Sequence, residues 1–351
     1  MRTAHLERAL ELAPADLIYG DRRYDFDENI SRAVAERSRL EQAGDWRAAW
    51  LIGTRGYSTI EVNEPIALET VRRTAIGLAS VAIADVLRRR RTTIVTYSIG
   101  NVPVLDLPAP SGKARLGRRL DLWLAPRLWR RIDRIAFGTD AAVAAYAESF
   151  GEAGPRTVST VIPALPCACG CPQPSSEALG PRLLFLGDLS HRKGFDRVIA
   201  AWPEVRARIP SATLVVVGRG AMTDTAAALA NDDERVLFIE DPPRMVVHEE
   251  LRRATVVVLP SRPHRGWREQ VGLPLIEGLA HGCTVVTTDE TGIAGWLSAH
   301  GHHTVSDQDA DTLLPDALVR SLSGPRDPDD VIADLPDQDG RLMADKWLFQ
   351  G

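Results

Sequence analysis

The feature that most constrains the fold is the alternation of short apolar runs with helical patterns in the second half of the chain. Amphipathic segments separate these runs. The runs are 182–187, 212–218, 236–240, 255–260 and 284–288, and the helical segments are 195–208, a segment from about 224, 246–254 and 275–281. This β-α-β-α order predicts a parallel sheet covered by helices on both faces.

The first half shows the same pattern less regularly. Its candidate strands are 15–20, 47–53, 92–98, 134–139 and 158–163, with helical stretches such as 29–43 and 66–90. The predicted fold class is therefore α/β, with two Rossmann-like parallel-sheet domains facing each other across a cleft. Ligands of such domains bind at the carboxyl ends of the strands.

A proline-rich strip divides the chain near its middle. Residues 163–181 hold five prolines and show no apolar periodicity, which is typical of an extended interdomain linker. The predicted organisation is an N-terminal domain over 1–162, this linker, and a C-terminal domain over 182–306. An acidic tail over 307–351 follows, and its end can pack back on the N-terminal domain.

The composition excludes some classes of function. The 351 residues carry a net charge of −5, without the basic excess of a nucleic-acid binder. The charged N-terminus is unlike a cleaved targeting peptide, and the longest apolar run, 74–87, is too short to span a membrane. We expect a cytoplasmic protein with no nucleic-acid partner.

Three of the four cysteines lie in the strip, at Cys167, Cys169 and Cys171. Alternate-residue spacing matches neither a zinc knuckle nor a usual disulfide framework, and the sequence shows no second ligand cluster beside it. We therefore predict no metal site and interpret the strip as a linker. Cys283 is expected to be a small core residue.

A candidate anion site follows the run 182–187. Arg192 and Lys193 stand directly before Gly194 and a predicted helix. A turn that joins a strand to a helix N-terminus presents free N–H groups and a favourable dipole to a diphosphate. The alternative is a solvated surface pair of cations, which the position within the β-α-β order disfavours.

The next distinctive stretch, WREQVGLPLIEGLAHG, holds two glutamates eight positions apart around a Gly-Leu-Pro step. Pro274 is costly inside a helix, so a helix beginning near it is predicted, with Glu269 in the preceding loop and Glu277 in the first turns. A carboxylate in such a turn suits ribose hydroxyls, and a loop carboxylate suits sugar hydroxyls. Alternatively, both glutamates only complement the helix dipole.

These stretches together resemble a known family. The segment 267–286 is similar to the glutamate, seven residues, glutamate signature of retaining glycosyltransferase family 4, whose fold is GT-B. The stretch FLGDLSHRKGFD resembles the phosphate-binding turn of that family, and the resemblance extends over about 181–301. It implies a metal-independent hexosyltransferase that needs no cofactor. Such an enzyme moves a sugar from a nucleoside-diphosphate sugar to an acceptor hydroxyl with retention.

The resemblance assigns roles to matching residues. Glu277 would bind the ribose, Glu269 the donor sugar and Lys193 the diphosphate, while the strand glycine Gly187 and the turn at Arg219 would line the nucleotide. The amides expected along the sugar and phosphates are those of Gln270, Val271, Gly272 and Leu273. The family usually has an arginine after the strand glycine, where this chain has Asp188, so Arg192 is expected to supply the missing charge.

The first domain departs from the family pattern. A glycine-rich loop is replaced by GDRRYDFDEN, and a middle-strand histidine by TYSIGN, which leaves Tyr97, Ser98 and Asn101 as acceptor-side candidates. The segment 113–134 interleaves apolar residues with arginines. This pattern suits either peripheral contact with the inner face of a membrane or a helix covering the sheet.

The acceptor is left open among saccharides, lipid-linked saccharides and small molecules. Two other functions remain as alternatives. A degenerate member would bind nucleotide sugar without transfer, which Asp188 and the altered first-domain loop favour. A nucleotide-sugar epimerase would need an acid/base set that the sequence does not display.

Overall fold

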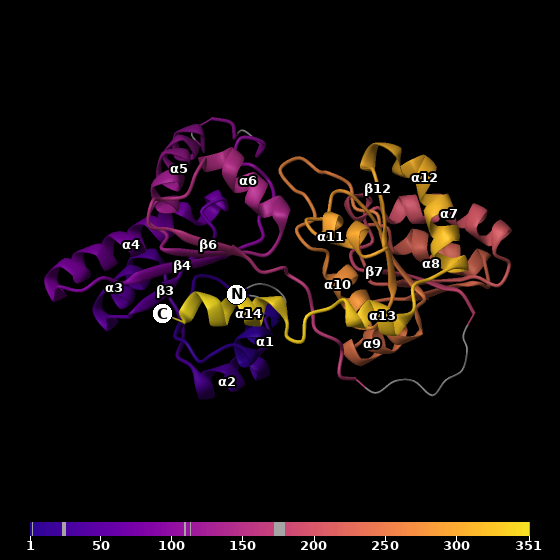
Figure 1. The fold of residues 1–351 in the computed structure, drawn as a ribbon, viewed down its shortest axis with the longest axis horizontal. Helices are drawn as coiled ribbons and strands as arrows, with labels where there is room; N and C mark the ends of the chain where they lie inside the picture. The colour runs from indigo at the N-terminus through magenta and orange to yellow at the C-terminus, as the bar shows by residue number, and fades with distance from the viewer. Residues whose placement is uncertain (2, 23–25, 109, 113, 172–179, 351) are drawn as a thin grey trace. The chain divides into compact units, whose positions relative to one another are not determined.

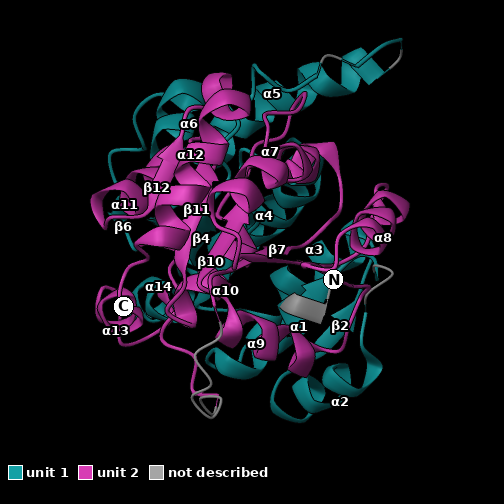
Figure 2. Ribbon diagram, turned by 90° about the vertical axis from the view of Figure 1, so that its right-hand side faces the viewer, with its two compact units in different colours: residues 1–138, 143–162, 341–351 teal, residues 139–142, 163–340 magenta. Residues whose placement is uncertain are grey.

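The computed structural model describes residues 1, 3–22, 26–108, 110–112, 114–171 and 180–350 (Figure 1). The chain forms two compact units. Unit 1 comprises residues 1–138, 143–162 and 341–351, and unit 2 comprises residues 139–142 and 163–340 (Figure 2). Each unit is an α/β body built on parallel strands.

Unit 2 is built on a six-stranded parallel sheet. Its strands are β7 (Arg182–Leu186), β8 (Thr213–Val217), β9 (Val236–Ile239), β10 (Val256–Leu259), β11 (Thr284–Thr288) and β12 (His303–Val305). Their order in the sheet is β12-β11-β10-β7-β8-β9. This is the doubly wound Rossmann order, in which successive strands are added to one side of β7 and then, from β10 on, to its other side.

Helices cover both faces of this sheet. They are α7 (Phe195–Arg208), α8 (Thr223–Asp232), α9 (Arg244–Arg253), α10 (Leu273–Ala280), α11 (Ala294–Ala299), α12 (Ala310–Ser323) and α13 (Pro328–Ala333), with 3₁₀ turns at His191–Lys193 and Asp307–Asp309. Figure 1 shows α7 and α12 on one face and α9, α10 and α13 on the other. The predicted alternation of strands and helices in this half is confirmed.

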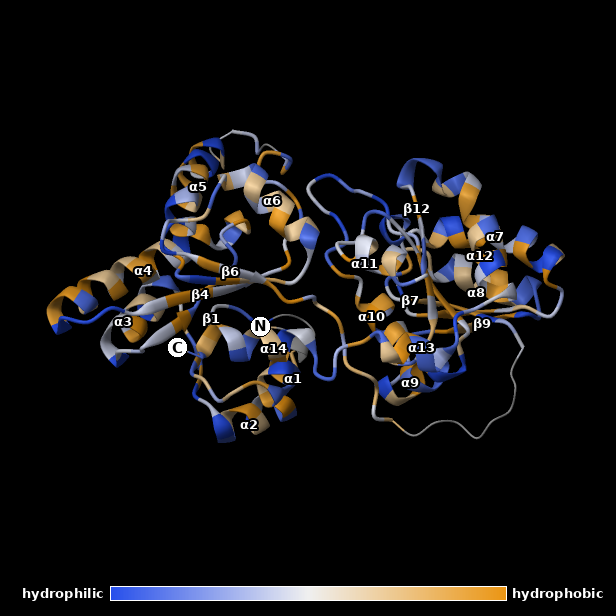
Figure 3. Ribbon diagram, viewed as in Figure 1, coloured by the Kyte–Doolittle hydropathy of each residue, from blue (hydrophilic) through white to orange (hydrophobic). Residues whose placement is uncertain are grey.

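The central strands are apolar because both of their faces are covered. Val256, Val257, Val258 and Leu259 of β10 are all inaccessible to solvent. A strand buried on both faces is a continuous hydrophobic run, and this is what made the runs visible in the sequence. In Figure 3 the helices α7 and α12 carry polar and apolar residues together, as expected for helices with one solvated face.

Unit 1 holds a smaller parallel sheet in the order β3-β4-β5-β6 and a separate parallel pair, β1-β2. Its strands are β1 (Leu17–Tyr19), β2 (Leu40–Gln42), β3 (Thr59–Glu61), β4 (Thr93–Ser98), β5 (Arg134–Phe137) and β6 (Val158–Val161). Its helices are α1 (Thr3–Glu11), α2 (Glu28–Arg37), α3 (Asp45–Arg55), α4 (Leu68–Arg88), α5 (Ala114–Trp129) and most of α6 (Asp140–Phe150).

One strand prediction in unit 1 is wrong. Residues 47–53 belong to helix α3, which has the acidic Asp45 in its first turn and ends at Gly56 in the left-handed conformation. A short apolar run does not distinguish a strand from a buried helix segment. Trp46 and Trp50, one helical turn apart, both face solvent, whereas Ala48 and Leu51 are buried. Exposed and buried residues therefore alternate with the period of a helix. The expected helix 29–43 also ends early, at Arg37, and is followed by β2.

The C-terminal segment is divided between the units. Helix α12 packs against α7 in unit 2, where it buries Leu314, Leu318 and Leu322 along one side. The C-terminal domain therefore continues well beyond residue 306. Helix α14 (Gly340–Phe349) packs in unit 1, where Ala344 and Leu348 join a core cluster with β4 and β5.

The proline-rich strip is part of unit 2 up to residue 171, whereas 172–179 of the predicted linker lie outside the described residues. Leu165 is buried, and its carbonyl accepts the backbone N–H of Gly340 at 2.9 Å. The Cys169 N–H donates to the Ala280 carbonyl at the end of α10, at 2.8 Å. This part of the strip is therefore anchored to unit 2 by hydrogen bonds and burial.

Within the described residues, no helix has both the length and the apolar composition that spanning a bilayer requires.

Candidate functional site

The candidate site lies where the strand order of unit 2 reverses. The loops that follow β7 and β10 leave the sheet at its carboxyl edge from adjacent strands. This is the position at which doubly wound sheets bind their ligands. The predicted residues Lys193 and Glu269 lie one on each of these two loops.

Glycines shape the turn after β7. Gly187 has φ 132°, and Gly194, between the 3₁₀ turn and α7, has φ 73°. A Cβ on Gly194 would lie 2.0 Å from the Pro260 carbonyl oxygen, so this position is in backbone contact with the loop after β10. Only glycine combines this conformation with so close an approach. The contact brings Lys193 against the second loop.

Lys193 and Glu269 form an ion pair. Lys193 Nζ donates to Glu269 Oε2 at 2.5 Å, and their side chains are only 14% and 9% exposed. Ser261 Oγ donates to the same carboxylate oxygen at 3.0 Å. Two residues that are 76 positions apart in sequence are thus joined in a largely buried pair.

Arg192 lies beside this pair. Its guanidinium is 4.1 Å from the ring centroid of Trp267, and the Lys193 ammonium is 5.4 Å from the same ring. Asp188, at the position where the family usually has an arginine, accepts from Arg192 at 3.4 Å and from the Ser190 hydroxyl at 2.7 Å. Arg192 thus offsets the Asp188 charge in the structure.

The loop before α10 is held by the turn that follows β11. The N–H of Gly292 donates to the carbonyls of Glu269 at 3.1 Å and Gln270 at 3.0 Å, and Thr291 Oγ1 donates to the Val271 carbonyl at 2.9 Å. These hydrogen bonds hold residues 269–271 of the loop against residues 291–292.

The start of α10 confirms the predicted helix. Gly272 has φ 80° and precedes α10, which begins at Leu273 with Pro274 in its first turn. Pro274 has no N–H, and the N–H groups of Leu275 and Ile276 donate to the Gly272 carbonyl at 2.8 and 3.2 Å. What α10 offers an anion beside Lys193 is therefore mainly the positive end of its helix dipole.

Glu277 and Arg219 form separate ion pairs. Glu277 lies within α10, as predicted, and its carboxylate is 2.6 Å from Arg244 Nη1 at the start of α9. Arg219, which follows β8, is 3.1 Å from Asp241, and both side chains are exposed. Glu277 thus already has a cationic partner that a ribose would have to displace or share.

Unit 1 places its three candidates at the end of β4. The Tyr97 ring lies 4.6 Å from the Arg341 guanidinium, whereas Ser98 and Asn101 are buried. Ser98 Oγ donates to the Tyr146 hydroxyl at 3.1 Å. Ser98 is therefore part of the unit 1 core, and Tyr97 is the most accessible of the three.

Glu64 is a functional candidate that the sequence reading missed. Its carboxylate accepts the backbone N–H groups of Ile99 at 3.1 Å and Gly100 at 2.8 Å, and the Tyr146 hydroxyl at 3.4 Å. Burial raises the pKa of Glu64 to about 7, although the two N–H groups oppose this shift. No local sequence signal marks Glu64, because its partners come from the two residues after β4 and from α6.

Metal-ligating side chains also gather in unit 2, from the proline-rich strip, α9 and the residue after α10. Cys169 and Cys171 lie against His248 of α9 and His281, which directly follows α10. The sequence reading missed the two histidines because they lie 77 and 110 positions from Cys171. The alternate-residue spacing of the strip cysteines by itself argued against a metal site, and the two histidines are what complete the cluster.

The sequence similarity to a known protein family lies in the C-terminal half of the chain. Residues 180–323 match the sequence model of the family described as Glycosyl transferases group 1. The phosphatidyl-myo-inositol mannosyltransferase of Propionibacterium freudenreichii subsp. shermanii is 30% identical over 158 residues, 42% of this chain and 36% of the relative. The glycogen synthase of Mycobacterium tuberculosis (strain CDC 1551 / Oshkosh) is 34% identical over 148 residues, 41% and 34% of the respective chains.

The chain spans about a third of the length of these curated relatives. Over nearly its whole length it resembles the solved structure of HepE from Anabaena in complex with UDP, with a TM-score of 0.63 and 13% identity. That match covers 96% of this chain and 95% of the other. The fold is accordingly the two-domain α/β fold of GT-B glycosyltransferases.

Proposed function

We propose that this protein is a retaining glycosyltransferase of the family 4 type, which moves a hexose from a nucleoside-diphosphate sugar to an acceptor hydroxyl. The observation that carries the proposal is the Lys193–Glu269 pair at the reversal point of a Rossmann sheet. The match of residues 180–323 to the group 1 glycosyl transferases supports it.

The site residues suggest how a donor would bind. A diphosphate near the N-termini of α7 and α10 would meet the ammonium of Lys193, with the Arg192 guanidinium close by. Lys193 would then be shared between Glu269 and the diphosphate, which orients the Glu269 carboxylate toward the donor sugar. Glu277 would accept the ribose hydroxyls in place of its contact with Arg244.

Transfer with retention would need no protein nucleophile. The enzyme would hold the acceptor hydroxyl against the anomeric carbon while Lys193, Arg192 and the α10 N-terminus stabilise the departing nucleoside diphosphate. These fixed positive charges would perform the role that a metal ion has in other transferases. We therefore propose that the transfer step is metal-independent.

We further propose that unit 1 takes the acceptor and that helix α5 contacts a membrane surface. Leu116, Leu120 and Trp123 recur at helical spacing and are 71%, 46% and 53% exposed. The Arg127 guanidinium lies 3.6 Å from the Trp123 ring centroid. An exposed apolar line with arginines suits the surface of an anionic membrane, where a lipid-linked acceptor would be found. The helix runs through Pro126 without ending there.

The first experiment is a thermal-shift screen against UDP, GDP, ADP and their sugars, with and without Mg²⁺. A ligand at about 100 times its dissociation constant adds roughly 2.7 kcal/mol of stability. Stabilisation by one nucleotide class should be lost in Glu277→Gln and kept in Glu249→Gln, a matched change on the exposed side of α9. If no nucleotide raises the melting temperature, the donor site is disproved.

Product analysis then separates transfer from its alternatives. A new glycosidic bond with retained anomeric configuration supports the proposal. Donor binding without any product would support a degenerate binder, which the Asp188–Arg192 pair favours. An isomerised donor would indicate an epimerase.

Membrane contact is tested by sedimentation with vesicles of phosphatidylglycerol and phosphatidylcholine. Trp123→Glu should reduce the bound fraction at low ionic strength, because it places a charge on the apolar line. Leu237→Glu, a change at an exposed leucine of β9, is the control. Equal binding by both variants would exclude α5 as the contact.

A further inference from the structure

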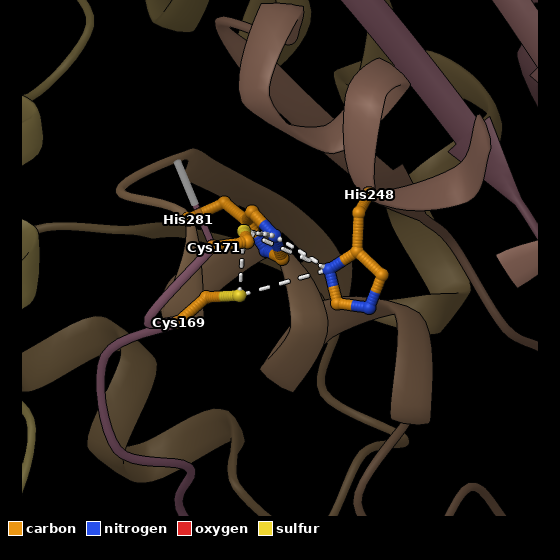
Figure 4. Close-up of side chains that lie close together, drawn as sticks. All are labelled: Cys169, Cys171, His248 and His281. Carbon is orange, nitrogen blue, oxygen red and sulfur yellow. Dashed lines mark hydrogen bonds between the residues drawn. The ribbon is translucent and has the colours of Figure 1, made fainter. Parts of the chain in front are cut away.

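Four side chains from three separate segments converge in unit 2 (Figure 4). Cys169 and Cys171 come from the proline-rich strip, His248 from α9, and His281 from the residue after α10. Their four ligand atoms all lie within 4.8 Å of one another. In the described parts of the chain, this is the cluster that has the composition and compactness of a metal site.

The distances match a single tetrahedral ion. With Zn–S near 2.3 Å and Zn–N near 2.05 Å, tetrahedral ligand atoms lie about 3.6 Å apart for S···N, about 3.3 Å for N···N and about 3.8 Å for S···S. The structure has 3.6 and 3.9 Å from His248 Nδ1 to the two sulfurs, 3.4 Å from His281 Nε2 to Cys171 Sγ, and 3.1 Å between the two nitrogens. The sulfur pair, at 2.8 Å, would have to open by about 1 Å, and the sixth pair, Cys169 Sγ and His281 Nε2, lies within 4.8 Å.

The ligands are already oriented by their neighbours. His281 Nδ1 lies 2.7 Å from the Glu277 carbonyl, so it donates there and leaves Nε2 for the cluster. Metal-binding histidines characteristically hold their second nitrogen in this way. The Cys169 N–H bond to the Ala280 carbonyl fixes the strip against the same end of α10.

The donor set also suits the charge of a divalent cation. Cysteine and histidine bind a metal as thiolate and neutral imidazole, so two of each would bring a charge of −2 to the ion.

We propose that Cys169, Cys171, His248 and His281 form a structural zinc site. Two sulfurs and two nitrogens in a closed tetrahedral set are the donors typical of structural zinc and leave no open position for a substrate. On binding, the two thiols would release their protons to solvent, and the two thiolates would balance the charge of Zn²⁺. This proposal goes beyond the glycosyltransferase assignment and does not depend on it.

Zinc at this position would cross-link the strip, α9 and the end of α10. Helix α9 begins with Arg244 and helix α10 contains Glu277, which are paired with each other at the proposed ribose site. The ion would therefore fix the spacing of the two helices that carry this pair. It would also tie residues 169–171 to unit 2, a role that a flexible linker does not have.

The experiment measures metal content in the untagged full-length protein, purified in reductant from cells grown with zinc. We expect about one zinc ion per chain by elemental analysis, and less than about a tenth of that in Cys171→Ser and His281→Gln. Loss of an outer-shell partner alone costs about 10–100-fold in affinity, so the loss of a ligand should cost at least that much. Matched controls are Cys167→Ser and His264→Gln, which change a cysteine and a histidine outside the cluster.

Unfolding of the variants would not obscure the result, because the unaltered protein can be stripped with a chelator and titrated with Co²⁺. The proposal expects the intense visible bands of tetrahedral cobalt with thiolate ligands, saturating at about one equivalent and displaced by Zn²⁺. Absent bands, equal zinc in the ligand and control variants, or a Cys169–Cys171 disulfide that persists in reductant would overturn it. No glycosyl donor is needed, so this outcome is independent of the transferase test.

Discussion

The Lys193–Glu269 pair offers the sharpest test of the site. Lys193→Met removes the charge and keeps an unbranched apolar side chain, and Glu269→Gln removes the opposite charge at constant shape. The double variant removes both. Because both side chains are largely buried, each single change leaves a charge in the interior without its partner.

The magnitude follows from the geometry. At the 2.5 Å separation and an effective dielectric constant near 20, the gross attraction is about 7 kcal/mol. Desolvation offsets most of this gain, at several kcal/mol for each ion. Removing one partner should lower the free energy of unfolding by about 3–5 kcal/mol. In the double variant, the free energy of unfolding should fall by less than in either single variant.

Urea unfolding of the four proteins at pH 7 measures this cycle, with the donor nucleotide omitted. We expect a coupling energy of at least about 2 kcal/mol between the two positions. Strictly additive single variants would refute the argument, because they would mean that the two charges do not stabilise one another. With the donor present, and at a temperature at which Lys193→Met is still folded, its turnover should fall well below that of the unaltered protein.

Three further predictions concern positions outside this pair. Gly194→Ala should cost at least about 2 kcal/mol in thermal unfolding, because its Cβ would meet the Pro260 carbonyl at positive φ, while Gly295→Ala, with no atom nearby, should be nearly neutral. Burial lowers the pKa of His302 from 6.5 to about 4, so between these pH values the unfolded chain binds a proton that the folded chain does not. As pH falls from 6.5 to 4, the free energy of unfolding should therefore decrease by about 3 kcal/mol relative to that of His302→Gln. Burial raises the pKa of Glu64 from 4.5 to about 7, so between these pH values the folded chain keeps a proton that the unfolded chain releases. As pH rises from 4.5 to 7, the free energy of unfolding should therefore decrease by about 3 kcal/mol relative to that of Glu64→Gln. Equal slopes of unfolding free energy against pH in protein and variant would contradict either titration.

Several elements were predictable because a local pattern was sufficient. The run 256–259 is apolar on both faces, which indicates a central strand. Pro274 marks the start of α10, because its ring is tolerated in a first helical turn and not in the interior. By contrast, the short apolar run 47–53 predicts a strand but forms a helix, because a run of this length does not distinguish the two. Only the structure shows that Trp46 and Trp50 face solvent.

The sequence by itself determined the α/β alternation of unit 2, the turn at Lys193 and the positions of Glu269 and Glu277 around a helix start. These follow from patterns within a few residues. Only the tertiary structure decided the partners: Lys193 with Glu269, Glu277 with Arg244, and the two strip cysteines with His248 and His281. The physical reason is that such contacts depend on which strands are neighbours in the sheet and which helices share a face. Side chains far apart in sequence come together only when the whole core is packed.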